Sequence, residues 1–495
     1  MHNFYYDETE HSRIINYDTV KANNYYENFV TSIVGWKVEY EKELYDKYIE
    51  FEHKYDFRKK DGELKSLTMK PKDFQYGFAS LNKNTIEFYE DLLEIFDEKI
   101  IIYLSVFSKI EYIINQLFKN YHNSLFIDVD YMKYSIVKSI VVYKPKNVIE
   151  SIYDNKRNFI YELCEFIKDR IEKNKRNIQL KQNENKAFEQ ILLLLNEIEA
   201  PETFEWNYVT SFDGFAKLLK EMNIKEYTIT IDKEGESSKT LEAAQKIGIM
   251  NAIEGESIEF IGVRIADMLV GLIAKFMKAL KKSLDNDYDN IQKKLLDYRW
   301  FKLNKRQAIL YKKLYKIICV DNKYWYNTYS GAYSDDLIVF ISFLQYISKV
   351  ESLEGLTDQE CLLQSEYFNS YACRSLQIHY ERMKNKIPIE VIPDSVEDFF
   401  ENSKGAKVYK DISKQPMLDI KEGSNEYKVL SVGINNEGTP LVTIEEGKEI
   451  VCYRIPDEYR EWVMTIVAIA SIGENLFPEI VRFSLVDGKY YADIL

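Results

Sequence analysis

The chain has 495 residues, of which 46% are apolar, 14% aromatic and 29% charged. This composition is typical of a globular protein and excludes a disordered or fibrous one. Asp and Glu total 80 against 66 Lys and Arg, which gives a formal charge of −14. So acidic a chain is not expected to coat nucleic acid non-specifically, although a local basic groove remains compatible with it.

The cysteines and histidines exclude several classes of site. Five cysteines are spread along the chain without a CxxC pair, which excludes a cysteine zinc site and argues against a disulfide framework. No histidines have the HExxH spacing of metalloproteases. The polar, acidic start is not a signal peptide, and the apolar run 462–473 is too short to span a bilayer. The sequence therefore predicts a soluble, cytoplasmic protein without a membrane segment.

The first 107 residues alternate between strand and helix patterns. Aromatic and β-branched runs predict strands at 2–7 and 28–36, and helical periodicity follows over 37–55. A second helix is expected at 85–97 and a buried strand at 99–107. In 108–222 apolar residues recur at three- and four-residue steps, so this block is interpreted as a helical insertion.

Strand chemistry returns at 227–231, and a long helix is expected within 258–282. Residues 301–390 look mostly helical, and glycine-containing turns in 391–495 indicate a small β-rich C-terminal module. We therefore expect an α/β fold. Its mixed-sheet core comprises 1–107 and 223–300, is split by the insertion 108–222, and is followed by the helical region 301–390 and the terminal module.

Four carboxylates occupy positions from which they could converge. Asp7 ends the first strand, Glu63 follows a loop, Asp232 ends a later strand, and Asp267 lies inside an apolar helix. Acids at strand ends and on a helix over the sheet can meet at one point. Their oxygens are the ligands that Mg²⁺ prefers, and paired divalent ions support phosphoryl chemistry.

Asp267 is the most informative of the four. Gly271 and Ala274 follow it one and two turns later, so this face of the helix lets another element approach closely. An acid buried there needs a cation or hydrogen-bond donors. The alternative is a salt bridge to Arg264 on the same face. An apolar stripe accompanies Asp267 along the helix: Ile265, Met268, Leu269, Leu272, Ile273 and Phe276.

Each of the other candidate residues also has a purely structural explanation. Asp7 and Glu8 could begin a turn, Glu63 could be a solvated loop charge beside Lys65, and Asp232 could cap the turn after its strand. His11 and His122 fit surface or hydrogen-bonded histidines. Cys164 and Cys319 lie in apolar surroundings and fit the core.

Taken together, four short motifs resemble the family catalogued as domain of unknown function 3800. They are the strand ending in Asp7-Glu8, the Gly62–Lys65 segment, the strand ending in Asp232, and Ile265-Ala266-Asp267 with Gly271. Family members carry Asp-Glu-Ser-Gly, Glu-x-Lys and Gln-Leu-Ala-Asp at these places. This chain has Thr9-Glu10 in place of Ser-Gly, and Arg264 in place of Gln.

The resemblance implies a ribonuclease-H-like fold and a divalent-metal site. Asp7, Glu63 and Asp267, with Asp232 as a fourth ligand, would bind Mg²⁺ or Mn²⁺ for phosphodiester hydrolysis, and Lys65 would neutralise developing charge. By analogy, a role in antiviral defence against phage or other mobile elements is expected. The resemblance covers residues 1–107 and 225–300 and implies nothing for the helical insertion or the terminal module.

A basic segment independently suggests a nucleic-acid partner. Residues 275–316 contain thirteen Lys and Arg against four Asp, interleaved with aromatic residues, a mixture suited to phosphates and bases. A solvated helix face over an aromatic core would look similar. The nucleic-acid-binding residues predicted here are Lys275, Lys278, Lys281, Lys282, Lys293, Lys294, Arg299, Lys302, Lys305 and Arg306.

The sequence is therefore compatible with two functions. The first is a metal-dependent nuclease, a hydrolase acting on DNA or RNA. The second is a non-catalytic platform on a degenerate core, which binds nucleic acid, a partner protein or a second copy of the chain through its tyrosine-rich helices. Loss of Mg²⁺-dependent cleavage on replacing Asp7 distinguishes them.

Overall fold

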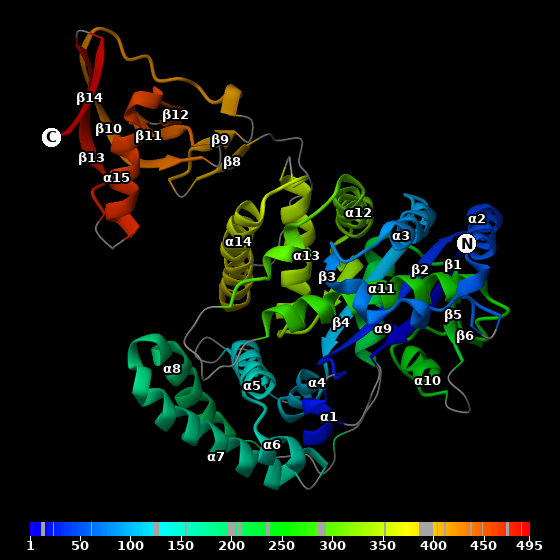
Figure 1. The fold of residues 1–495 in the computed structure, drawn as a ribbon. Coiled ribbons are helices and arrows are strands. Elements are labelled where there is room, and N and C mark those ends of the chain that lie inside the picture. Colours follow the sequence, from blue (N-terminus) through cyan, green and yellow to red (C-terminus); the bar gives the residue numbers. More distant parts are fainter. Residues whose placement is uncertain are drawn as a thin grey trace. The chain divides into compact units, whose positions relative to one another are not determined.

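In the computed structural model, the predicted N-terminal strand lies in the middle of a six-stranded mixed sheet (Figure 1). The strand order is β6-β5-β1-β2-β4-β7. β1 pairs antiparallel with β2, which pairs antiparallel with β4, whereas the other neighbours are parallel; β2 alone therefore runs against the other five. The strands are β1 (His2–Thr9), β2 (Asn28–Lys37), β4 (Ile101–Ser108), β5 (Tyr227–Asp232), β6 (Ala252–Gly255) and β7 (Thr328–Ser330).

This sheet belongs to the first of two compact units, Met1–Pro388 and Ile389–Leu495, each of which is described by itself. The structure describes the chain apart from residues 11–14, 23, 61, 120, 122–127, 154–155, 197, 199–203, 205–208, 234–237, 286–293, 351–352, 386–398, 403, 410–411, 436–437, 448, 472–474 and 487.

Alternation along β1 assigns its side chains to two different cores. Phe4 and Tyr6 pack on the face covered by α9 (Val209–Glu221) and α10 (Lys239–Lys246). Tyr5 packs on the opposite face, with α11 (Ile261–Leu284). Because successive side chains of a strand point to opposite faces, Asp7 shares the α11 face with Tyr5.

A large aromatic core fills the space between α11 and the helices around it. α11 is buried along most of its length, which explains its near-continuous apolar sequence. Phe276 on α11 contacts Trp300 and Phe340 with ring centroids 5.6 and 5.4 Å apart. The other elements on this side are α2 (Glu41–Lys54), β3 (Gln75–Phe78), α3 (Lys83–Ile95), α12 (Lys305–Tyr315), α13 (Asp335–Lys349) and α14 (Asp358–Asn385).

The predicted insertion is helical and builds a core of its own. Apolar side chains of α4, α5, α7 and α8 bury one another there. α9 is the exception, because it packs on the sheet instead. The helices of the insertion that build this core are α4 (Lys109–Leu117), α5 (Val129–Tyr143), α6 (Lys146–Glu150), α7 (Lys156–Asn174) and α8 (Ile178–Leu195), and α1 (Tyr17–Lys21), from the N-terminal region, packs against them.

The second unit contains the antiparallel sheet expected of a β-rich module, in the order β12-β11-β10-β13-β14, and a two-stranded ribbon of β8 and β9. A helix, α15 (Arg460–Ser471), buries Val463 and Ile466 in the core of this sheet. The sequence analysis expected only strands and turns here. The strands are β8 (Phe399–Glu401), β9 (Lys407–Tyr409), β10 (Gly423–Ile434), β11 (Pro440–Glu446), β12 (Glu449–Arg454), β13 (Glu479–Val486) and β14 (Lys489–Ile494).

The architecture is thus mixed α/β, as expected from the sequence. Five short elements, α1, β3, β6, β7 and α10, were not predicted; β7 falls inside the region expected to be mostly helical. Over the part of the chain that the structure describes, no helix is long and apolar enough to cross a bilayer.

Candidate functional site

Asp7 and Asp232 lie side by side on neighbouring parallel strands. Asp232 is the last residue of β5, as expected, whereas β1 continues past Asp7 to Thr9; the predictions that Asp7 ends its strand or begins a turn are therefore wrong. β1 and β5 pair in a register that sets Tyr6 beside Ile231, so the next residues along the two strands are the two acids. Both point to the α11 face, because the residues before them pack in the opposite core. The register of β1 and β5 thus places the two acids beside each other.

A hydrogen bond fixes Asp267 over the same point of the sheet. The Ser32 hydroxyl of β2 donates to the Ala266 carbonyl of α11 at 3.0 Å, and Ser32 is the cross-strand partner of Asp7. The helix therefore presents Asp267 beside Asp7. Gly262 permits this approach, since a Cβ there would lie 2.2 Å from the Tyr5 ring.

The electrostatics show that the three acids interact. Burial, followed by the charges of Asp267 and Asp232, raises the pKa of Asp7 well above its usual range. Burial and the charge of Asp267 raise the pKa of Asp232 to about 6. We call Asp7, Asp232 and Asp267 the carboxylate cluster.

Glu63 stands beside this cluster, held by its own partners. Its side chain is buried and accepts a hydrogen bond from the Ser257 hydroxyl at 2.8 Å. Lys65 Nζ lies 3.5 Å from the Glu63 carboxylate. The charge of Glu63 raises the pKa of Asp232, whereas that of Lys65 lowers it. Glu63 is therefore not a solvated loop charge.

Ser66 is a site residue that the sequence analysis missed. Its amide and hydroxyl donate to the two oxygens of Asp267 at 2.7 and 2.5 Å. Gly271 makes room for it, since a Cβ there would lie 2.2 Å from the Ser66 Cβ. The expected close approach on this helix face is thus made by the loop that begins with Lys65. Gly271 in an otherwise apolar helix was the signal that could have identified such a partner.

Arg264 does not pair with Asp267, so that alternative is wrong. Its guanidinium donates to Glu52 at 3.3 Å and to the carbonyl of Ser257 at 2.9 Å. Both Arg264 and Glu52 are buried, and neither is free to neutralise the cluster. The long, planar side chain reaches past its own helix turn to a partner on α2.

Glu10, where the family pattern has Gly, retains the backbone conformation that favours glycine. Its φ is 60°, in the left-handed region. The carboxylate pairs with Lys278 of α11 at 2.8 Å. The additional negative charge at this position is therefore compensated.

A cavity of about 910 Å³ adjoins the cluster, and most of the predicted nucleic-acid-binding residues line it. We call it the basic cavity. Lys302 and Arg306 instead form ion pairs with Asp358 and Glu90, and Lys305 also lies outside the lining. Lys293 lies outside the described residues. The predicted residues that line the cavity are Lys275, Lys278, Lys281, Lys282, Lys294 and Arg299.

The acids have the oxygen chemistry that a hard divalent ion requires. Among the described residues, however, no three His, Cys, Asp or Glu side chains are already grouped to hold a metal ion. The hydrogen bonds from Ser66 occupy both oxygens of Asp267. A cation bound by Asp7, Asp232, Asp267 and Glu63 would therefore displace the Ser66 donors or share the Asp267 oxygens with them.

Comparison with known proteins gives this chain no family. No family model, curated protein or solved structure matches it.

The remaining predicted positions divide into core and undescribed residues. Cys164 is buried and Cys319 mostly so; burial raises the pKa of both thiols, that of Cys319 to about 12, which suits unreactive core cysteines. His11 and His122 lie outside the described residues.

Proposed function

We propose that the chain is a divalent-metal-dependent nuclease, which hydrolyses phosphodiester bonds at the carboxylate cluster. The observation that carries this proposal is that acids from two strands and a helix lie close together: the charges of Asp267 and Asp232 raise the pKa of Asp7, and the charge of Asp267 raises that of Asp232. Buried carboxylates in one place repel each other unless a proton or a cation compensates them. A divalent cation is the compensating partner that also serves phosphodiester chemistry.

The sheet supports the ribonuclease-H-like core that the resemblance implies. Counting from β4 to β6, five strands follow the order β4-β2-β1-β5-β6, and β2 alone runs antiparallel. This is the arrangement expected of such a core, with the first acid on the central strand. A shared fold would favour a shared chemistry without proving it.

In this proposal, acidic and basic side chains of the chain have separate roles. Asp7, Asp232 and Asp267 supply metal-binding oxygens, with Glu63 beside them. Lys65 and Lys275 supply positive charge for the phosphate; Lys275 Nζ donates to the Ser66 carbonyl at 3.0 Å, next to Asp267. Bound at these oxygens, Mg²⁺ or Mn²⁺ supplies charge neutralisation and activation of a water molecule.

The test compares Asp7→Asn with the wild type and with Asp56→Asn, which removes an exposed acid paired with Lys59. Mn²⁺ binding is measured by calorimetry, and cleavage of labelled single- and double-stranded DNA and RNA is measured with Mg²⁺ or Mn²⁺. We expect Asp7→Asn to lower cleavage by about a thousandfold or more and to weaken Mn²⁺ binding, and Asp56→Asn to change neither. Cleavage retained in Asp7→Asn would contradict the proposal.

One observation favours the alternative, a non-catalytic platform that binds nucleic acid or a protein partner. The Ser66 hydrogen bonds already satisfy Asp267, so the cluster has donors as well as repulsion. In a degenerate site these donors replace the metal. A wild-type protein that neither binds Mn²⁺ nor cleaves any of the four substrates would favour the platform.

A further inference from the structure

We propose that the basic cavity receives a single strand of nucleic acid, with the helical insertion as one wall of the channel. This inference rests on the proposed nuclease function and names the substrate class of the same site. It also assigns phosphate-binding roles to lysines outside the basic segment 275–316. The principal ones are Lys21, Lys72 and Lys144.

The charge of the lining calls for an anionic occupant. Nine basic side chains and four acidic ones line the cavity, in a chain whose formal charge is −14. Lys72, Lys144 and Lys282 form no ion pair with any residue that the structure describes. Unpaired cations concentrated around one hollow repel each other, and a polyanion with repeated charges relieves that repulsion.

The cations face one another across two walls. Along α11, Lys275, Lys278 and Lys282 follow each other by about one helical turn and form a row on one side. The opposite side includes Lys144, which follows α5 with a φ of 46°, and Lys21 at the end of α1. Phosphates of one strand can therefore be held from both sides.

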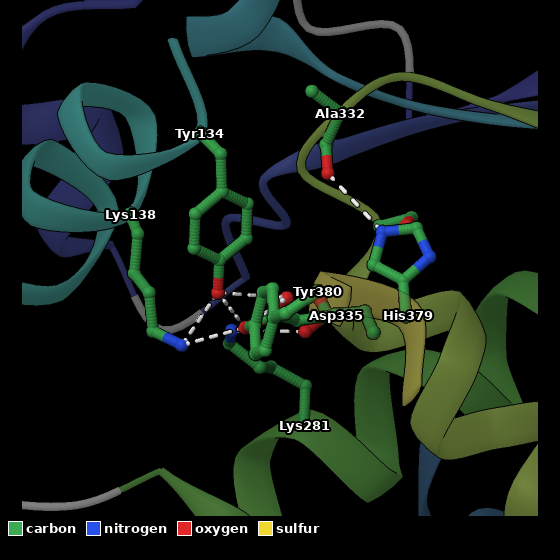
Figure 2. Close-up of polar contacts among 9 residues, drawn as sticks. Tyr134, Lys138, Lys281, Ala332, Asp335, His379 and Tyr380 are labelled. Carbon is green, nitrogen blue, oxygen red and sulfur yellow. Dashed lines mark hydrogen bonds and ion pairs between the residues drawn. The ribbon is translucent and has the colours of Figure 1, made fainter. Parts of the chain in front are cut away.

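A polar network attaches the far wall to the rest of the unit (Figure 2). The Tyr134 hydroxyl of α5 donates to Asp335 at 3.1 Å, and Lys138 Nζ bridges Asp335 at 3.1 Å and the Tyr380 hydroxyl at 3.0 Å. Tyr380 also donates to Asp335, so α5, α13 and α14 meet at one carboxylate. Since Lys144 directly follows the same helix, this network fixes where the far wall stands.

Two residues that line the cavity connect it to the carboxylate cluster. Lys275 lines the cavity and donates to the carbonyl of Ser66, whose amide donates to Asp267. Glu10, three residues after Asp7, also lines the cavity and pairs with Lys278. A strand lying along the α11 lysines therefore ends with its backbone at the proposed metal site.

Size and aromatic lining favour an unpaired strand over a duplex. A duplex is bound across an extended protein surface. A hollow of about 910 Å³ is of the size that encloses a drug-sized ligand, so it suits a segment of a single strand better. Tyr25 and Tyr76 add ring surfaces to the lining, and stacking of exposed bases on such rings is a property of single-strand sites.

The test measures binding without catalysis, in EDTA, by fluorescence anisotropy of labelled dT20, rU20 and a 20-base-pair duplex. Lys144→Glu/Lys282→Glu reverses one cation on each wall. Its matched control, Lys83→Glu/Lys225→Glu, makes the same charge change at two exposed lysines outside the cavity. Thermal unfolding of each variant reports folding, and Lys144→Gln/Lys282→Gln provides a milder neutralisation.

We expect at least one single strand to bind more tightly than the duplex. The cavity variant should weaken that binding by about tenfold or more and reduce the salt slope by about 1.4, the value for two lost phosphate contacts. The control should bind within about twofold of the wild type. Preference for dT20 or rU20 then identifies the strand as DNA or RNA.

Other outcomes overturn the inference. Equal losses in the cavity variant and the control, tighter duplex binding, or no binding of any probe would each show that the cavity is not a single-strand channel. Because no metal or cleavage is involved, such a result is separate from the Asp7→Asn test. A protein that cleaves but fails here retains the nuclease function with a different substrate path.

Discussion

The two halves of α11 place charge in opposite settings. The first half carries Asp267 against the sheet, where burial and neighbouring acids raise the pKa values of Asp7 and Asp232. The second half carries Lys278 and Lys282 along a cavity open to solvent, which moderates their repulsion. The cluster therefore requires a compact counter-charge, whereas the cavity suits an extended one.

The largest effect is expected where the two halves meet, at Gly271. Replacing Gly by Ala inside a helix ordinarily stabilises a protein by about 1 kcal/mol. In Gly271→Ala the new methyl group collides with Ser66 and pushes its loop off Asp267. We expect a net loss of about 1–3 kcal/mol in the free energy of unfolding, measured by urea denaturation.

Gly433 provides the control, because it lies in β10 and a Cβ there meets nothing within 4 Å. Gly433→Ala should leave the free energy of unfolding within about 0.5 kcal/mol of the wild type. A stabilised Gly271→Ala would show that the loop does not press on α11, and the assignment of Ser66 as the partner of Asp267 would fail.

A smaller effect is expected from pH on metal binding. The pKa of Asp232 is raised to about 6, so below that pH a cation must displace its proton. Between pH 7 and pH 5 we expect the Mn²⁺ affinity to fall by about tenfold or more, as measured by calorimetry. An affinity that is constant over this range would exclude Asp232 as a ligand.

In the metal-free protein, pH has the opposite effect on the stability of the fold: stability falls as the pH rises. A carboxyl group whose pKa is raised by folding favours the folded state most when it is protonated. Its contribution is fully present below its unfolded value of 3.8 and is lost as the pH rises through about 6. In EDTA, the melting temperature of Asp232→Asn relative to that of the wild type should therefore increase as the pH is raised from 4 to 7. An unchanged difference would contradict the burial of this acid.

The smallest effect is expected at the end of the basic segment that lies outside the cavity. Lys302 is exposed and pairs with Asp358, and Lys305 does not line the hollow. Lys302→Glu/Lys305→Glu should weaken single-strand binding by no more than about twofold, measured by anisotropy. A loss as large as that of the cavity variant would favour the linear segment over the three-dimensional cavity as the binding determinant.

Much of the fold could be predicted because its elements have strong local patterns. The alternation in β1 and β2, the apolar length of α11 and the helical repeats of the insertion all reflect burial of one face. β7 and α15 were missed for physical reasons. β7 has three residues at a sheet edge, too few for a pattern, and the apolar run of α15 suits a strand as well as a helix.

The candidate site could likewise be predicted only where its residues have a local sequence pattern. Asp7 and Asp232 were identifiable because each follows the apolar residues of a strand, and Asp267 because it interrupts an apolar helix. Ser66 and Glu52 were not, since a loop serine and one acid among many on an amphipathic helix carry no local signal. Their partners, Asp267 and Arg264, are about 200 residues away in the sequence.

By itself, the sequence determined which residue types are available: acids at strand ends, a glycine-bearing apolar helix and a concentration of lysines. Only the tertiary structure decided which of them meet. It pairs Arg264 with Glu52, closes Ser66 over Asp267, and adds Lys144 of the insertion to the cavity while leaving Lys302 outside. The reason is that secondary structure follows from neighbours along the chain, whereas the partners of a charge depend on long-range packing.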